Sequence, residues 1–278
     1  MTAIRLLSAL LISSGLTGCA AVSDPPAIPR HDNTDAVIWL QSSSEYAALT
    51  TGLYVSATAA LDRIAADGDP SGMAIVLDVD ETVLDNSPYQ GQLILDDDRY
   101  RSETWDPWLA LRDAVEVPGV VEFIQAAQTR GFHIAFITNR TCQARPTTQD
   151  RCPQIEDTRV NLEAVGIDTS KTTLFLRGQQ PPQACLALLT EAEQPSGVWS
   201  TSDKTSRRAC VEQERDIVML FGDQMGDFTE AHGSDGRSSA AAFDKHWGRT
   251  WFMLPNPTYG GWKPRDAAEK RARIRAIR

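Results

Sequence analysis

An apolar strand that runs directly into two carboxylates is the feature that most constrains this chain. Residues 73–79 are mostly apolar, and Asp78 and Asp80 stand two positions apart at the end of the run. Because strand side chains repeat every two residues, both carboxylates can emerge on one side of the chain end. Open α/β folds bind their ligands just outside the carboxyl edge of the sheet. Two negative groups held this close need a cation, a shared proton or distinct roles, so the pair indicates chemistry.

The N-terminal residues have the pattern of an export signal. A basic residue precedes an apolar run that is too short to span a bilayer, and small residues follow. Residues 16–19, Leu-Thr-Gly-Cys, resemble the bacterial lipobox. This resemblance implies a signal peptide over 1–18, lipidation of Cys19 and, because Ala20 rather than Asp follows, the outer membrane. An ordinary signal peptide with an incidental cysteine is the alternative.

Composition bounds the rest of the molecule. The proline-containing stretch 19–35 is typical of a tether, and the remaining residues suffice for one sizeable core. A helical segment is expected over 36–70 and the main domain over 71–278. The net charge of −10 argues against a general nucleic-acid binder, because such proteins need basic surfaces. Any anionic substrate must therefore be held by local cations.

Four cysteines besides Cys19 are available for disulfides: Cys142, Cys152, Cys185 and Cys210. An even number in an exported protein permits two bridges and three pairings. We favour Cys142–Cys152 with Cys185–Cys210, because both closures are local. Four free buried thiols are the alternative. The absence of a CxxC pair and of clustered histidines argues against a zinc site.

Strands and helices alternate through most of the chain. An interrupted apolar stripe predicts one broken helix or two helices over 35–67. The alternation that follows predicts an α/β fold with a parallel sheet and right-handed crossovers. The expected strands are 73–79, 132–137, 173–176, 217–221 and 250–254, and the expected helices are 118–130, 156–165, 204–212 and the basic tail 265–278.

Further polar residues lie at or near the ends of these elements. They are Thr138, Asn139, Arg140, Lys204, Asp223 and Asp227. Each alone has an ordinary interpretation as a turn, cap or surface residue. Their order along the chain, an acid pair, a hydroxyl, a lysine and a second acid pair, indicates a single site instead.

In these motifs the chain resembles the haloacid dehalogenase (HAD) superfamily. The runs Asp78–Ser87, Ile137–Arg140 and Met253–Trp262 look like those of the class C acid phosphatases, which are bacterial outer-membrane lipoproteins. The resemblance implies a Rossmann-like α/β fold in which helices flank a parallel sheet. It also implies an N-terminal helical segment that packs on the core and a small lid inserted at about 86–115.

The resemblance also implies roles for the site residues. Asp78 is expected to attack phosphorus and form an aspartyl-phosphate, with Asp80 as general acid and then base. Superfamily members that hold their phosphoenzyme carry Thr at the position of Asp80, so Asp favours hydrolysis. Thr138 is expected to bind the transferring oxygens, and Lys204 to offset their charge.

The implied cofactor is Mg²⁺, a hard cation that prefers oxygen ligands. Asp78, Asp223 and the backbone carbonyl of Asp80 are the expected ligands, with Asp227 orienting waters or Lys204.

Two departures from the family pattern bear on these roles. The segment 177–202 looks longer than the usual connection, which leaves Lys171 and Arg177 as alternatives to Lys204. In addition, Gly226 stands where the family often has an acid, so Asp223 and Asp227 must suffice.

Substrate contacts are expected from Asn139 and Arg140 and from aromatic residues, namely Trp105, Trp108 and Tyr259. Such rings either stack a nucleobase or pack the lid against the sheet. The leading hypothesis is a Mg²⁺-dependent, broad-specificity acid phosphatase for small phosphate monoesters, including nucleotides as a 5′-nucleotidase. The alternatives are a sugar-phosphate or metabolite phosphatase, and a non-catalytic surface lipoprotein that binds haem or a nucleotide. The oligomeric state stays open, with a homodimer as one alternative.

Overall fold

The computed structural model describes residues 31–230, 240–264 and 266–275. The expected signal peptide, Cys19 and most of the tether lie outside these residues. The elements in chain order are α1 (Thr34–Ser42), α2 (Ser44–Ala66), η1 (Pro70–Gly72), β1 (Met73–Leu77), β2 (Leu84–Asp85), α3 (Ser87–Leu95), α4 (Ser102–Leu111), β3 (Val115–Glu116), α5 (Val120–Thr129), β4 (His133–Thr141), α6 (Pro153–Ala164), β5 (Thr173–Arg177), η2 (Gln183–Leu188), α7 (Thr205–Glu212), β6 (Asp216–Gly222), η3 (Met225–Asp227), β7 (Trp251–Met253) and α9 (Ala267–Arg273).

The main sheet is parallel throughout, which confirms the predicted α/β class. Its order is β5-β4-β1-β6-β7, and each neighbouring pair is parallel. After β1 the chain adds β4 and then β5 on one side of β1, and it later adds β6 and then β7 on the other side of β1. The carboxyl ends of β1 and β6 therefore lie at the topological switch point, where such sheets bind ligands.

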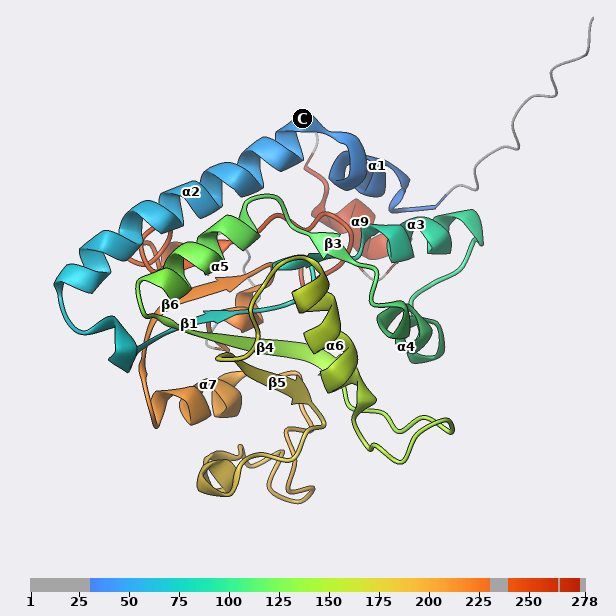
Figure 1. Ribbon diagram of the computed structural model, residues 1–278. Coiled ribbons are helices and arrows are strands. Elements are labelled where there is room, and N and C mark those ends of the chain that lie inside the picture. Colours follow the sequence, from blue (N-terminus) through green and yellow to red (C-terminus); the bar gives the residue numbers. More distant parts are fainter. Residues whose placement is uncertain (1–30, 231–239, 265, 276–278) are drawn as a thin grey trace, which may run out of the picture.

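Alternation along β1 divides the core between the two faces of the sheet. Ile75 and Leu77 pack in a cluster with residues of α2 and α5, whereas Ala74 and Val76 pack in a second cluster with Val211 of α7. Figure 1 shows α2 and α5 together on one side of the sheet and α7 on the other. Because helices cover both faces of the sheet, its strands are continuous apolar runs in the sequence.

The N-terminal helical segment packs on the core as expected, with a break between two helices. The break comes at Ser43, whose hydroxyl accepts a hydrogen bond from the backbone N–H of Tyr46 (3.0 Å) and so caps α2. Further along α2, Tyr54 is 1% exposed and stacks on Phe221 with ring centroids 5.6 Å apart. Its hydroxyl donates to the backbone carbonyl of Thr82 (2.6 Å). Helix α2 thus contacts the segments that follow β1 and end β6.

The lid insertion consists of α3 and α4, framed by the short antiparallel pair β2 and β3. Ion pairs help to attach it to the core. Arg145 pairs with Asp106 of α4 (2.7 Å) and with Asp157 of α6 (2.6 Å), and Arg112 also pairs with Asp157 (2.8 Å). Arg145 lies in the loop that one disulfide closes, so the lid is tied to a constrained segment.

Both disulfides join the pairs that we favoured from the sequence. Cys142 is bonded to Cys152, and Cys185 is bonded to Cys210. The second bridge ties η2, within the long 177–202 segment, to helix α7. None of the helices in the described part of the chain is long and apolar enough to cross a membrane.

Candidate active site

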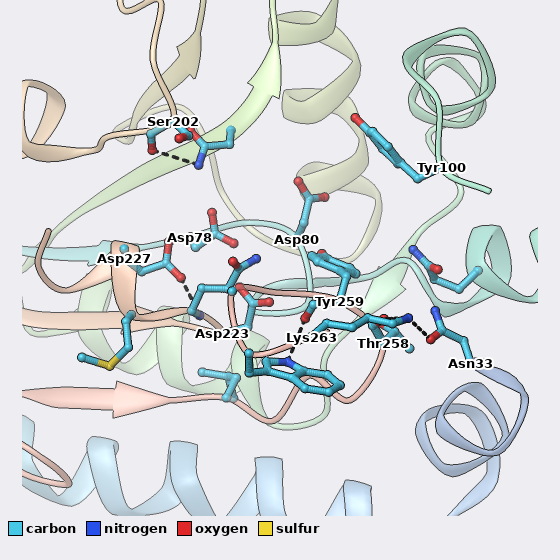
Figure 2. A pocket seen from close by; sticks show the side chains of 18 of the residues that line it. Asn33, Asp78, Asp80, Tyr100, Ser202, Asp223, Asp227, Thr258, Tyr259 and Lys263 are labelled. Carbon is cyan, nitrogen blue, oxygen red and sulfur yellow. Dashed lines mark hydrogen bonds between the residues drawn. The ribbon is translucent and has the colours of Figure 1, made fainter. Parts of the chain in front are cut away.

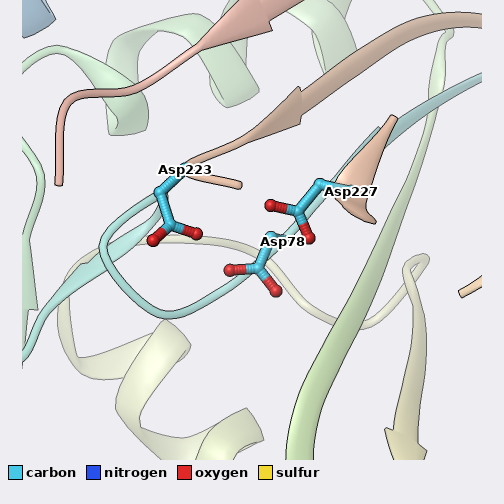
Figure 3. A group of neighbouring side chains, drawn as sticks. All are labelled: Asp78, Asp223 and Asp227. Carbon is cyan, nitrogen blue, oxygen red and sulfur yellow. The ribbon is translucent and has the colours of Figure 1, made fainter. Parts of the chain in front are cut away.

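Three carboxylates converge at the switch point of the sheet. Asp78 directly follows β1, and its backbone N–H donates to the carbonyl of Phe221 on β6 (3.0 Å). Asp223 follows β6, and Asp227 ends η3. One carboxylate oxygen from each residue lies within 4.8 Å of the others. Figure 3 shows the three side chains directed toward a common point.

Lys204 joins this cluster, as the sequence predicted. It stands immediately before α7, and its Nζ contacts Asp78 and lies 2.6 Å from a carboxylate oxygen of Asp227. The two alternatives are elsewhere: Lys171 is exposed in a turn, and the Arg177 side chain donates to the hydroxyl of Thr141 (3.0 Å). The long 177–202 segment therefore leaves the position of Lys204 intact.

The charge balance of the cluster favours a bound cation. All three carboxylates are buried, with exposures of 7% for Asp78, 9% for Asp223 and 7% for Asp227. Burial raises the pKa of Asp78 to about 7 although Lys204 opposes the shift, and burial together with Asp227 and Asp78 raises the pKa of Asp223. Burial alone would lower the pKa of Lys204, but its carboxylate partners outweigh it and raise that pKa. One lysine facing three carboxylates leaves negative charge that a divalent cation would offset, and oxygen donors suit such an ion.

Gly222 provides the space that Asp227 occupies. A Cβ atom on Gly222 would lie 2.2 Å from the Cβ of Asp227 and 2.3 Å from its Oδ2, far inside contact distance. The same Oδ2 accepts a hydrogen bond from the backbone N–H of Gln224 (2.9 Å), which fixes the carboxylate against the chain. The glycine before Asp223 is thus required for a close approach, although its φ is not positive.

Asp80 points away from the carboxylate cluster (Figure 2) and is held by donors of its own. Its Oδ1 accepts hydrogen bonds from Arg140 Nε (2.9 Å), Arg140 Nη2 (2.8 Å) and Asn86 Nδ2 (2.9 Å). Its Oδ2 faces the Thr138 hydroxyl at 3.3 Å. Three donors on one oxygen leave Oδ2 as the atom that can exchange a proton. The Asp80 carboxylate is not part of the cluster, which leaves its backbone carbonyl as the expected metal contact.

Arg140 was expected to contact substrate, but its side chain is only 1% exposed and is occupied by Asp80 and the Thr158 hydroxyl. The structure places it behind Asp80 as a support. Trp108 is likewise directed inward: it packs against the core, and its Nε1 donates to Asn86 Oδ1 (2.9 Å). Together with Asn86, these side chains orient Asp80. Arg140 still borders the pocket, whereas Trp108 does not line it as we expected.

Asn256 is a site residue that the sequence reasoning did not single out. Its Nδ2 donates to Asp223 Oδ2 (2.7 Å). Its Oδ1 accepts from the backbone N–H (2.9 Å) and the hydroxyl (2.6 Å) of Thr258, which fixes the orientation of the amide. Asn86 and Asn256 both lie in runs that carried the family resemblance, and that was the only signal for either.

The carboxylates open into a pocket of about 1870 Å³. Four of the expected contacts line it, namely Asn139, Arg140, Trp105 and Tyr259, and Tyr100 and Trp262 add aromatic surface. Figure 2 shows the side chains of Tyr100 and Tyr259 near Asp80. The Asn139 side chain is already engaged: it donates to the Ser202 carbonyl (3.1 Å) and accepts from Arg207 Nη2 (2.8 Å).

Comparison with known families agrees with this geometry. The family model described as HAD superfamily, subfamily IIIB (Acid phosphatase), matches residues 20–262. The chain belongs to this family. The matched range includes the carboxylate cluster, Lys204 and the residues that hold Asp80.

Solved structures of similar proteins support the subfamily IIIB assignment. A class C acid phosphatase from Bacillus anthracis with tungstate bound is 29% identical, covers 88% of this chain and 97% of its own, and has a TM-score of 0.69. A second structure of the Bacillus anthracis class C enzyme gives 27% identity, the same coverage and a TM-score of 0.67.

Two curated plant proteins are more distant. The stem 28 kDa and stem 31 kDa glycoproteins of Glycine max are each 26% identical over 66% of this chain. The match spans 58% and 50% of their lengths.

Proposed function

We propose that this chain is a Mg²⁺-dependent acid phosphatase of broad specificity that hydrolyses phosphate monoesters. The observation that carries the proposal is the division of its acids. Asp78, Asp223 and Asp227 form a buried cluster around Lys204, whereas Asp80 is held separately by Arg140 and Asn86. Phosphoryl transfer needs this combination, because it is catalysed mainly by positioning and by neutralising charge on the phosphoryl oxygens.

Each residue then has a defined task. Lys204 holds Oδ1 of Asp78, which leaves the other oxygen to attack phosphorus and form an aspartyl-phosphate. Asp80 delivers a proton from Oδ2 to the leaving alkoxide and then takes one from the water that hydrolyses the intermediate. A bound Mg²⁺, held by Asp78, Asp223 and the Asp80 carbonyl, would supply further charge neutralisation. Asn256 keeps Asp223 oriented for that role.

The pocket favours leaving groups that contain a ring. A volume of about 1870 Å³ exceeds what a small sugar phosphate needs, and Tyr100, Trp105 and Tyr259 line it. Aromatic faces accept any base without a matched hydrogen-bond pattern. We therefore propose nucleoside 5′-monophosphates as good substrates, with sugar phosphates as poorer ones.

A phosphate-release assay tests the reaction. Purified protein is treated with EDTA, restored with Mg²⁺ and supplied with nucleoside monophosphates, sugar phosphates and an aryl phosphate. We expect EDTA to abolish turnover, Mg²⁺ to restore it, and nucleotides to give the highest kcat/KM. Asp78→Asn should remove activity, whereas Asp168→Asn at an exposed site should not. Turnover that survives in Asp78→Asn would refute the aspartyl-phosphate mechanism.

We further propose that Cys19 carries a lipid and anchors the enzyme to the bacterial outer membrane. The lipobox-like run before Cys19 supports this location. Metabolic labelling with a radiolabelled fatty acid tests it, because Cys19→Ser should lose the label and leave the membrane fraction. Light scattering of the detergent-solubilised protein would distinguish a homodimer from a monomer.

A further inference from the structure

Three cations at the start of α7 each contact a different part of the site. Lys204 contacts the carboxylate cluster, as described above. Arg208 Nη1 donates to the carbonyls of Gly226 and Asp227, both at 3.1 Å. Arg207 contacts the residues at the end of β4. One helix thus connects segments that are far apart in the sequence.

Arg207 is the most unusual of the three because it is a buried cation that no carboxylate among the described residues contacts directly, although the charges of Glu193 and Asp78 favour it from a distance. It is 0% exposed, and in the described part of the chain no carboxylate forms an ion pair with it. Burial lowers the pKa of its guanidinium to about 10. Its Nε is buried without a hydrogen-bond partner. A buried charge without a direct ion pair is costly, so we expect this position to depend on the hydrogen bonds that the guanidinium makes.

The hydrogen bonds of Arg207 are divided between the residues that end β4 and the backbone carbonyls of residues 201–203. Nη1 donates to the backbone carbonyl of Thr138 (2.6 Å), and Nη2 donates to Asn139 Oδ1 (2.8 Å) and to the carbonyl of Asp203 (3.0 Å). The pairing of β4 with β5 shifts register between Thr138 and Thr141, so the regular ladder is interrupted at this point. Arg207 thereby holds a peptide group that regular sheet pairing does not fix.

Fixing this carbonyl fixes the rest of the peptide group. The peptide unit is planar and trans, so the N–H of Asn139 points opposite to the Thr138 carbonyl and away from Arg207. Asn139 lines the pocket beside Asp78. The same hydrogen bond restricts the backbone conformation of Thr138, whose hydroxyl faces Asp80.

We propose that Arg207 is a positioning residue for phosphoryl transfer. It holds the Thr138–Asn139 peptide so that the Asn139 N–H faces the phosphoryl oxygens and the Thr138 hydroxyl stays on Asp80, and it places a fixed positive charge behind them. This inference rests on the proposed phosphatase function and assigns Arg207 a task within it. Preorganised donors of this kind act mainly on the transition state.

The experiment compares Arg207→Gln, Arg207→Lys and a control, Trp199→Leu, in the intact protein. Trp199 is fully buried in the segment next to Arg207 and does not line the pocket, so its truncation destabilises the same region without releasing Thr138. Three quantities are measured: Tm, kcat and KM for an aryl phosphate, and inhibition by orthovanadate, which mimics the trigonal-bipyramidal transition state. Inorganic phosphate serves as the ground-state inhibitor.

For Arg207→Gln we expect kcat to fall about 100-fold, the usual effect of a small misplacement of catalytic groups. Vanadate inhibition should weaken in parallel, while KM and inhibition by phosphate change much less. Arg207→Lys keeps the charge but reaches fewer acceptors, so it should recover part of kcat. If Arg207→Gln does not fold, Arg207→Lys decides the matter.

Two results would overturn the proposal. One is a folded Arg207→Lys or Arg207→Gln enzyme with wild-type kcat and vanadate affinity. The other is a loss of kcat in Trp199→Leu as large as that in Arg207→Gln at matched Tm, since the effect would then be structural. Failure of the proposed function looks different, because the unmodified protein itself would release no phosphate.

Discussion

Substitution of Gly222 by alanine tests whether the carboxylate cluster requires its close packing. The added Cβ would lie 2.3 Å from Asp227 Oδ2, where ordinary contact begins at 3.4 Å, so the carboxylate must retreat by about 1.1 Å. That shift breaks the 2.6 Å contact with Lys204 or the 2.9 Å hydrogen bond from Gln224. Displacement of about 1 Å in a catalytic group costs about 100-fold in rate. Overpacking costs a further ~1–3 kcal/mol of stability.

The assay is a Mg²⁺ titration of phosphate release together with thermal unfolding. We expect Gly222→Ala to lose about 100-fold in kcat/KM, equivalent to ~2.7 kcal/mol, even where it remains folded. Gly226→Ala is the matched control, since its Cβ would meet only Glu230 Oε1 at 3.5 Å, and its loss should be much smaller. A folded Gly222→Ala enzyme with wild-type kcat/KM would show that Asp227 need not occupy this position.

Three further predictions follow from the contacts around the site. Asn256→Ala frees Asp223 from its 2.7 Å donor and should weaken Mg²⁺ activation by about 10–100-fold in the concentration required; an unchanged titration would exclude the orienting role. Asp106→Asn weakens the lid. Hydrogen bonds from Arg145 lower the pKa of Asp106 below its usual value of 3.8. The ionised Asp106 therefore contributes fully to the free energy of unfolding above pH 3.8, and this contribution is lost as the pH falls through the lowered pKa. The variant should therefore lose about 0.5–1 kcal/mol relative to the parent at pH 6, and this difference should shrink below pH 3.8; a difference that does not depend on pH would contradict the ion pair. Removing the Cys185–Cys210 bridge by paired serine substitution should cost about 3 kcal/mol in urea unfolding, and equal stability would show that the bridge does not constrain the unfolded chain.

The parts of the site that could be predicted from the sequence are those set by local pattern. An apolar run followed by Asp78 and Asp80 determines both a strand and the edge at which its acids emerge. The expected strand over 217–221 similarly anticipated β6 and the position of Asp223 after it. Lys204 could be named from motif order although the path of the preceding segment, with η2 and its disulfide, could not.

The directions of individual side chains could not be predicted in this way. Arg140 borders the pocket as expected, but the strand pattern could not show that its guanidinium is bonded to Asp80. Trp108 lies on α4, which has no strong periodic signal, and its contact with Asn86 depends on how the lid packs. Asn256 reaches Asp223 only because β7 lies beside β6, a neighbourhood set by the complete sheet.

The position of Tyr54 has a practical consequence for dividing this protein into parts. Its ring stacks on Phe221, and its hydroxyl donates to the backbone carbonyl of Thr82, so α2 packs against the two segments that carry Asp78, Asp80 and Asp223. The sequence suggests a cut near Gly68, between a helical stalk and an enzyme. A protein shortened there would expose Phe221 and release the Thr82 carbonyl. The smallest independently folding enzyme therefore includes α2, so a shortened form can dispense with the expected anchor but not with this helix.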